Sequence, residues 1–110
     1  MADPTVLPLD AVEWDEEAPG VRARHAELGG VRWAIVEYAP GGGRPEWCDV
    51  AHVGYVLSGE IRYEFSDTRS PLAARRGEGF TLPPGAAHRG KNHGSAPAIL
   101  LVIDEPYLAP

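Results

Sequence analysis

The chain contains one cysteine, Cys48, so it cannot form an internal disulfide. Because small secreted domains often depend on disulfides, we expect a reducing compartment and a cytoplasmic location. The N-terminus, Met1-Ala2-Asp3-Pro4, has no basic stretch followed by an apolar core, which predicts that it is not a signal peptide. No apolar run approaches the roughly 18 residues that a membrane-spanning helix requires. We therefore expect a protein that neither crosses a membrane nor depends on disulfides.

Basic residues are few: Lys and Arg number 10 against 16 Asp and Glu, and the formal net charge is -6. Binding to nucleic acid or to an anionic membrane needs a basic surplus, so we expect neither as a partner. At 110 residues, the chain is long enough for one domain with a modest core. The composition therefore favours an acidic, single-domain globular protein.

Helical periodicity over about eleven or more residues is missing, and glycine and proline separate many short segments instead. Residues 61–65 alternate between apolar and charged side chains, as a half-buried strand does. We predict strands at residues 21–28, 31–38, 46–58 (two short strands), 61–65, 72–75, 80–82 and 98–103, with a hairpin turn at Gly29-Gly30. This pattern predicts an all-β sandwich or barrel. An acidic lead-in over residues 1–20, with room for a short edge strand, precedes it.

One segment carries a more specific pattern than the strands do. It reads Gly77-x5-Pro83-x-Gly85-x2-His88-x3-Asn92. The two glycines permit positive φ at turns, and the proline fixes φ on entry to a turn. At all five defining positions this segment resembles the second conserved motif of the cupin superfamily. The resemblance implies a small single-domain cupin, with a double-stranded β-helix (jelly-roll) barrel over residues 21–110 and with His88 pointing into it.

The first cupin motif, Gly-x5-His-x-His-x3-4-Glu-x6-Gly, is matched only in part. Gly59 fits its closing glycine, and the family's glutamate then falls on His52. With a three-residue spacer, the two histidines of the motif fall on Cys48 and Glu46. With a four-residue spacer they fall on two poor metal ligands, Trp47 and Pro45. One motif is therefore intact, and the other is rewritten at every ligand position.

The resemblance implies a metal site whose ligands are Glu46, Cys48, His52 and His88. A carboxylate, a thiolate and two imidazoles all bind first-row metals, and this mixed set suits zinc, iron, nickel or copper better than magnesium or calcium. Glu46 and Cys48 are two residues apart, so on one strand they would face the same side. A slip of one residue in register would make Asp49 a substitute ligand.

A metal-free interpretation of the same residues stays open. A buried cysteine is usually a small hydrophobic residue, a barrel histidine can bond a backbone carbonyl, and Glu46 could sit on the rim in water. We expect His25, on a predicted strand, to be structural rather than a ligand. Arg32 alternates with apolar neighbours and is a candidate for the barrel mouth.

Two functions follow from the resemblance. The first is a metal-dependent enzyme of the dioxygenase, isomerase or cyclase type on a small organic substrate. His52 and His88 would be ligands, with Glu46 a ligand or a general base. Loss of the usual His-x-His argues against standard non-haem iron dioxygenase chemistry, although these three residues supply two histidines and a carboxylate in rearranged order. The second is a non-catalytic, metal-free module that binds a small molecule. In both cases the family implies a homodimer, which would close exposed strand edges.

Overall fold

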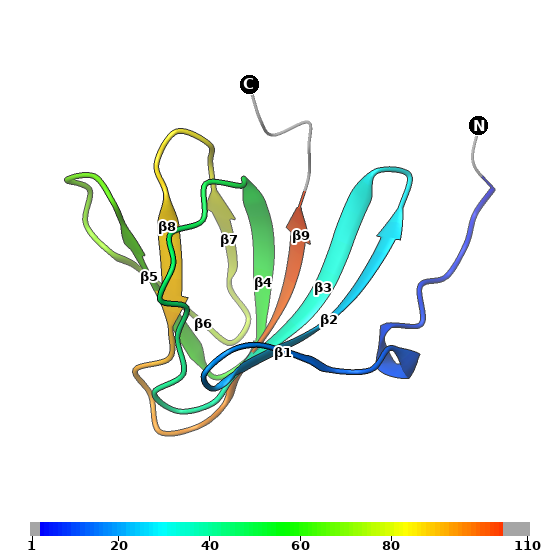
Figure 1. Ribbon diagram of the computed structural model, residues 1–110, viewed down its shortest axis with the longest axis horizontal. Coiled ribbons are helices and arrows are strands. Elements are labelled where there is room, and N and C mark those ends of the chain that lie inside the picture. Colours follow the sequence, from blue (N-terminus) through cyan, green and yellow to red (C-terminus); the bar gives the residue numbers. More distant parts are fainter. Residues whose placement is uncertain (1–2, 105–110) are drawn as a thin grey trace.

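The computed structural model describes residues 3–104, which form two antiparallel β-sheets (Figure 1). A short 3-10 helix, η1 (Leu9–Ala11), is followed by strands β1 (Asp15–Ala18), β2 (Val21–Leu28), β3 (Val31–Tyr38), β4 (His52–Ser58), β5 (Glu60–Phe65), β6 (Leu72–Arg75), β7 (Gly79–Leu82), β8 (His88–Lys91) and β9 (Ala98–Asp104). The larger sheet has the order β1-β2-β3-β9-β4-β7, and the smaller sheet has the order β6-β5-β8. The all-β prediction is confirmed.

Two parts of the sequence-based prediction fall partly outside the described range. Residues 1–2 of the lead-in and residues 105–110 of the predicted barrel domain are not among the described residues. Within the lead-in, β1 pairs with β2 and forms the edge of the larger sheet. No helix of the described part is long and apolar enough to cross a membrane.

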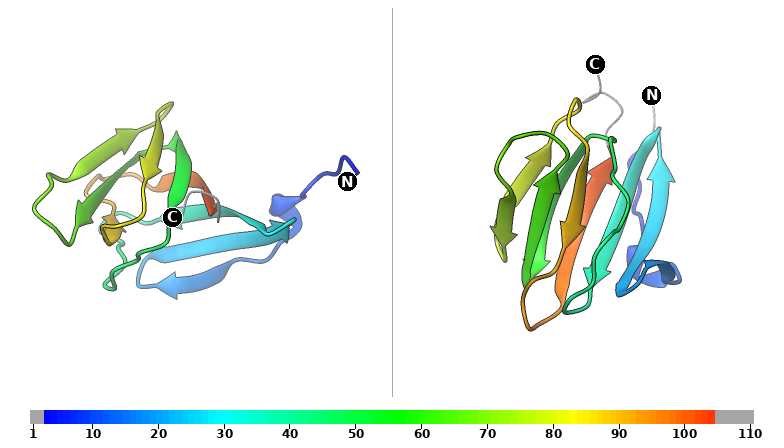
Figure 2. Two further views of the ribbon diagram at one scale, coloured as in Figure 1. Left: turned by 90° about the horizontal axis from the view of Figure 1, so that it is seen from above. Right: turned by 60° about the vertical axis from the view of Figure 1, so that its left-hand side comes forward.

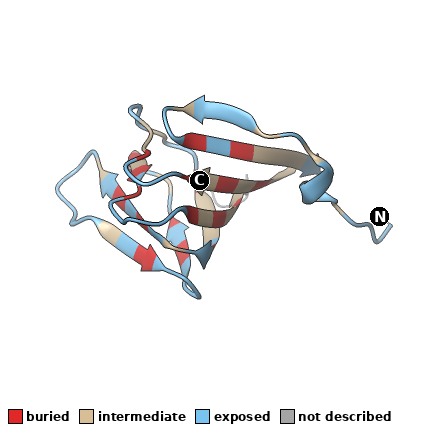
Figure 3. Ribbon diagram, turned by 90° about the horizontal axis from the view of Figure 1, so that it is seen from below, coloured by how far each residue is buried: buried red, intermediate tan, exposed pale blue. Residues whose placement is uncertain are grey.

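The core lies between the two sheets (Figure 2), and buried residues alternate with less buried ones along most strands (Figure 3). On β9, Ala98 and Leu100 are completely buried, whereas Ile99 between them is only partly buried. On β5, Ile61 and Tyr63 are buried, and their charged neighbours are exposed. The alternation predicted for residues 61–65 is thus confirmed. Polar residues in the inward-facing set therefore point into the space between the sheets.

The outer face of the larger sheet keeps some apolar side chains in contact with solvent. On β4, Tyr55 is 44% exposed and Leu57 is 43% exposed. Exposed apolar patches of this kind often mark contact surfaces between proteins. The homodimer that the family resemblance implies stays a prediction.

The connecting segment, residues 39–51, departs most from the prediction, which placed two strands within residues 46–58. The regular strand β4 begins only after this segment, which runs along β8 instead. Arg44 N donates to Gly90 O at 3.0 Å, and Cys48 and His88 exchange two backbone hydrogen bonds of 2.8 Å. The segment has more residues between Arg44 and Cys48 than β8 has between their partners Gly90 and His88. Pro45 also has no N–H to donate. A regular strand is therefore interrupted beside Pro45.

Asn92, the last residue of the second motif, holds three backbone groups together. It is completely buried. Its Nδ2 donates to the carbonyl oxygens of Tyr38 (3.0 Å) and Ala96 (2.8 Å), and its Oδ1 accepts from Gly94 N (2.8 Å). The asparagine of the motif therefore joins the end of β3 to the turn that follows β8.

Replacing Asn92 by alanine is expected to lower the free energy of unfolding by about 3 kcal/mol, because buried backbone groups lose their partners. Chemical denaturation would measure the loss. Asn92→Asp is the matched variant, since it keeps the shape but cannot donate to the two carbonyl oxygens. We expect a comparable loss from it. If both variants lost less than about 1 kcal/mol, the bonds of Asn92 would not be what stabilises this turn.

Candidate metal centre

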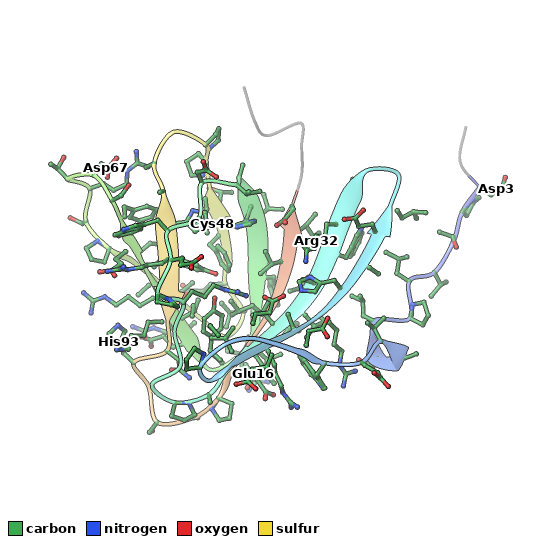
Figure 4. All side chains as sticks on the ribbon, in the orientation of Figure 1. Asp3, Glu16, Arg32, Cys48, Asp67 and His93 are labelled. Atoms are coloured by element: carbon green, nitrogen blue, oxygen red, sulfur yellow. The ribbon has the colours of Figure 1, made fainter. Side chains whose placement is uncertain are left out.

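The backbone places Cys48 and His88 side by side. Cys48 N donates to His88 O, and His88 N donates to Cys48 O, both at 2.8 Å. In an antiparallel pair that exchanges both hydrogen bonds, the two side chains point to the same face. Cys48 comes from the connecting segment (labelled in Figure 4) and His88 from the start of β8. His88 is only 3% exposed. It lines the internal cavity.

His52, the first residue of β4, completes a group of three metal-ligating side chains. One ligand atom from each of Cys48, His52 and His88 lies within 4.8 Å of the other two. Cys48 Sγ is 3.5 Å from His52 Nε2, and the two imidazole rings meet edge-on with their centroids 4.9 Å apart. Zinc binds thiolate at about 2.3 Å and imidazole at about 2.0–2.1 Å, so the 3.5 Å between Cys48 Sγ and His52 Nε2 suits two donors to one ion. The His88 nitrogen, within 4.8 Å of both, could join them after a small movement of its side chain.

The fourth predicted ligand, Glu46, lies outside this group. It is exposed, although it lines the same cavity. The expectation that Glu46 and Cys48 face the same side assumed one regular strand, and the connecting segment is interrupted between them. Asp49, the alternative after a slip in register, is also exposed and outside the group. Within residues 3–104, the structure brings together Cys48, His52 and His88.

Asp104, the last described residue of β9, orients the ring of His52. The two residues are direct cross-strand partners, and His52 Nδ1 hydrogen-bonds the Asp104 carboxylate. A neutral histidine that donates its Nδ1 proton keeps a lone pair on Nε2, the nitrogen that faces Cys48. Histidines that bind metals commonly give their other ring nitrogen to a carboxylate in this way. Sequence reasoning missed Asp104, although the alternation of β9 puts it on the inward-facing side with Leu100 and Val102.

The ring of His88 also fits a bound ion. Its Nδ1 is buried and has no hydrogen-bond partner within residues 3–104. Leaving such an atom unpartnered costs roughly 1–3 kcal/mol unless a ligand, water or ion meets it. One sulfur and two imidazole nitrogens suit a transition metal, and three protein donors leave a fourth position for water or substrate. The residues present therefore fit a metal of the kind that the family resemblance implies.

The ionisation of the centre favours the metal-binding form of cysteine. Hydrogen bonds with His52 and with His88 lower the pKa of the Cys48 thiol to about 6. Burial disfavours the charged form of His52, but hydrogen bonds to Asp104 and Cys48 outweigh it and raise the pKa of His52 to about 9. Near neutral pH, the metal-free protein therefore has a Cys48 thiolate beside a His52 imidazolium. Binding of an ion would release the His52 proton.

A cavity of about 730 Å³ contains the centre. This volume is typical of sites for small organic molecules. Its lining includes a second polar group, from β1, β2, β3 and the connecting segment, made of Glu17, His25, Arg32 and Arg44. His25, expected to be structural, hydrogen-bonds Glu17 and Arg32 and lies outside the metal-ligating group. The cavity therefore has a metal-ligating wall and a wall rich in arginine.

Comparison with protein families decides the identity of the fold. Residues 34–104, more than half of the chain, match the Cupin_2 family, which is described as a cupin domain. This chain belongs to the cupin family. The resemblance in the second motif is thus confirmed, and the rewritten first motif is a departure within the family.

Individual relatives agree with this assignment. Nectarin-1 of Nicotiana langsdorffii x Nicotiana sanderae is 32% identical over 91 residues, which cover 78% of this cupin but only 38% of nectarin-1. The polyketide cyclase RemF from Streptomyces resistomycificus has a TM-score of 0.74 at 18% identity, over 92% of this cupin and 78% of RemF. An RmlC-like cupin from Shewanella frigidimarina has a TM-score of 0.72 at 16% identity, over 96% and 92% of the two chains. At these identities the two structures show the shared fold alone, which is the predicted one.

The role of Asp104 in this cupin can be tested through metal affinity. We expect Asp104→Ala to weaken metal binding by about 100-fold and Asp104→Asn by about 10-fold, since the amide can still accept the proton but carries no charge. Competition with a chelator of known affinity would measure both. Asp49→Asn is the matched control, because Asp49 lines the same cavity but lies outside the group. An equal loss in Asp49→Asn would assign the effect to cavity charge rather than to the orientation of His52.

Proposed function

We propose that this cupin is a metal-dependent enzyme whose centre consists of Cys48, His52 and His88. The observation that carries the proposal is the convergence of their three ligand atoms within 4.8 Å, with the Asp104 carboxylate on the far nitrogen of His52. If the two histidines only filled space in the core, neither of two features would be explained. These are the buried His88 Nδ1, which has no partner within residues 3–104, and the Asp104 carboxylate hydrogen-bonded to His52 Nδ1. A transition metal bound there would supply Lewis acidity to an oxygen of a small organic substrate.

The donor set narrows the expected chemistry. Iron-dependent oxygenases typically use two histidines and one carboxylate. Here Glu46, the carboxylate that could complete that set, is exposed and outside the group, and Cys48 takes the third position. A thiolate and two imidazoles suit an ion such as zinc, and they support isomerase or cyclase chemistry more than dioxygenase chemistry. The structural neighbour RemF is a polyketide cyclase, and it supports this proposal through fold alone.

The chain's own residues would bind and orient the substrate. Asp104 holds His52 so that its Nε2 stays directed at the centre. Inward-facing side chains from both sheets line the cavity. The fourth position left by the three donors is where a substrate oxygen would bind.

Elemental analysis of protein purified without a histidine tag tests the proposal. We expect about one zinc, iron, nickel or copper ion per chain, or uptake of about one ion when chelated protein is reloaded with these metals. Folded protein that contains none of them and takes up none would overturn it. That result would favour the alternative, a non-catalytic, metal-free module that binds a small molecule in the same cavity.

A further inference from the structure

Arg32 lies on the same inward-facing row as His52. Asp104 on β9 is the cross-strand partner of both Arg32 on β3 and His52 on β4. Neighbouring strands are about 4.8 Å apart, so the Cα atoms of Arg32 and His52 are about 10 Å apart. Both residues line the cavity, and Figure 4 labels Arg32 and Cys48 toward the same end of the molecule. A molecule of a few carbon atoms can therefore contact Arg32 and the metal centre together.

Arg32 differs from every other arginine in the described residues. Six arginines form ion pairs with carboxylates: Arg22, Arg24, Arg44, Arg69, Arg75 and Arg89. Arg62 and Arg76 form none, but both are exposed to water. Arg32 is half-buried in the cavity wall, and no carboxylate within residues 3–104 lies at ion-pair distance from it. Its charge is thus the one partly buried arginine charge there without a direct counter-ion.

A chain of hydrogen bonds fixes the plane of the Arg32 guanidinium. Its Nε donates to His25 Nδ1 at 3.1 Å, so the His25 proton sits on Nε2, which bonds the Glu17 carboxylate. Glu17 also accepts from Arg44 Nη2 at 2.7 Å, and Arg44 Nε donates to the hydroxyl of the buried Tyr38 at 3.1 Å. The two Nη nitrogens of Arg32 have no partner within the described residues. They form the edge of a guanidinium that binds a carboxylate through two parallel hydrogen bonds.

The pairing of charges around the cavity leaves the guanidinium of Arg32 available to an anionic ligand group. Among the charged groups that face the cavity, Glu17 is paired with Arg44, and the Asp104 carboxylate is hydrogen-bonded to His52. The other charged side chains of the lining are Glu46 and Asp49, which are exposed and screened by water, and Arg89, which is paired with Glu64. Arg32 is therefore the partly buried cation of this lining without a paired carboxylate within residues 3–104, and a carboxylate of a ligand can complete the pair.

We propose that the Nη nitrogens of Arg32 bind a carboxylate of the substrate, while the reacting end of the substrate faces Cys48, His52 and His88. The second half of this statement rests on the proposed function. The first half rests on Arg32 and its hydrogen-bonded support alone. His25 and Glu17 would act as positioning residues, because they hold the guanidinium of Arg32 in place. The proposed substrate is a small organic acid.

Isothermal titration calorimetry of the zinc-loaded protein tests the proposal with malonate, succinate and glutarate, and with succinamide and inorganic phosphate for comparison. We expect at least one dicarboxylate to bind more tightly than phosphate, and succinamide not to bind. Arg32→Gln should weaken the binding of that dicarboxylate at least 10-fold. Arg32→Lys keeps the charge but not the planar guanidinium, so it should weaken the binding less. Arg22→Gln, on the neighbouring strand β2 and 47% exposed in its side chain, is the control and should bind as the wild type does.

Several results would overturn the assignment of Arg32. The first is that no dicarboxylate binds. The second is that phosphate binds at least as tightly as the best dicarboxylate. The third is that the wild type and both Arg32 variants are folded and bind the dicarboxylate equally well. Zinc content, measured in each sample, separates this test from that of the proposed function. If the wild type takes up no metal, the titrations are repeated on metal-free protein. Loss of dicarboxylate binding in Arg32→Gln would then support the carboxylate site while the metal-dependent function fails.

Discussion

The His52→Ala/His88→Ala double variant is expected to contain no stoichiometric metal. It removes both imidazoles from a group whose three ligand atoms lie within 4.8 Å of one another, and Cys48 alone cannot chelate an ion. Each lost ligand weakens a metal site by orders of magnitude, so the content should fall from about one ion per chain to the background level. Elemental analysis measures the content, and circular dichroism checks that the variant is folded.

The chain offers a matched control for this experiment. It contains four histidines, and the other two, His25 and His93, lie outside the metal-ligating group. A His25→Gln/His93→Ala double variant removes the same number of imidazoles and should keep the full metal content. Equal loss in both double variants would point to adventitious binding that does not depend on which histidines are present, and full retention in His52→Ala/His88→Ala would place the metal elsewhere.

Gly59→Ala should lower the free energy of unfolding by about 4 kcal/mol. Gly59 has a φ of 76°, where a residue with a Cβ costs about 1–2 kcal/mol. A Cβ there would also meet Pro97 O at 2.3 Å and Ala98 Cα at 2.9 Å. Both are backbone atoms, so no side chain can rotate away, and the turn between β4 and β5 would have to separate from the start of β9. Urea denaturation measures the loss. It would be a large share of the total free energy of unfolding, which is roughly 5–15 kcal/mol for a native protein.

Gly77→Ala separates the two contributions. Gly77 also has a positive φ, 88°, but a Cβ on it would meet nothing within 4 Å. Gly77→Ala should therefore lower the free energy of unfolding only by the cost of holding a residue with a Cβ at positive φ, about 1–2 kcal/mol. If Gly59→Ala and Gly77→Ala were equally destabilising, the close approach of Pro97 would contribute nothing to the stability of the turn.

The strands were predictable where neighbouring residues alone determine them. Residues 21–28 and 31–38 are found as β2 and β3, because alternation and the Gly29-Gly30 turn act within one hairpin. The second motif was equally informative, since Gly77 and Gly85 take the positive φ values that were expected of them, 88° and 106°. The strands expected within residues 46–58 were wrong over the connecting segment, whose partner is β8, about forty positions further along the chain.

The sequence by itself determined the cupin barrel and the spacing that puts Cys48, His52 and His88 at the family's ligand positions. It did so because turn glycines, alternation and motif spacing act over short stretches of chain. Only the tertiary structure decided that Glu46 is exposed, that Asp104 orients His52, and that no carboxylate of residues 3–104 lies at ion-pair distance from Arg32. These features depend on which strands pair: His52 and Asp104 are 52 positions apart and meet because β9 lies between β3 and β4. Pairing of distant strands is a property of the whole folded chain, which local sequence preferences do not encode.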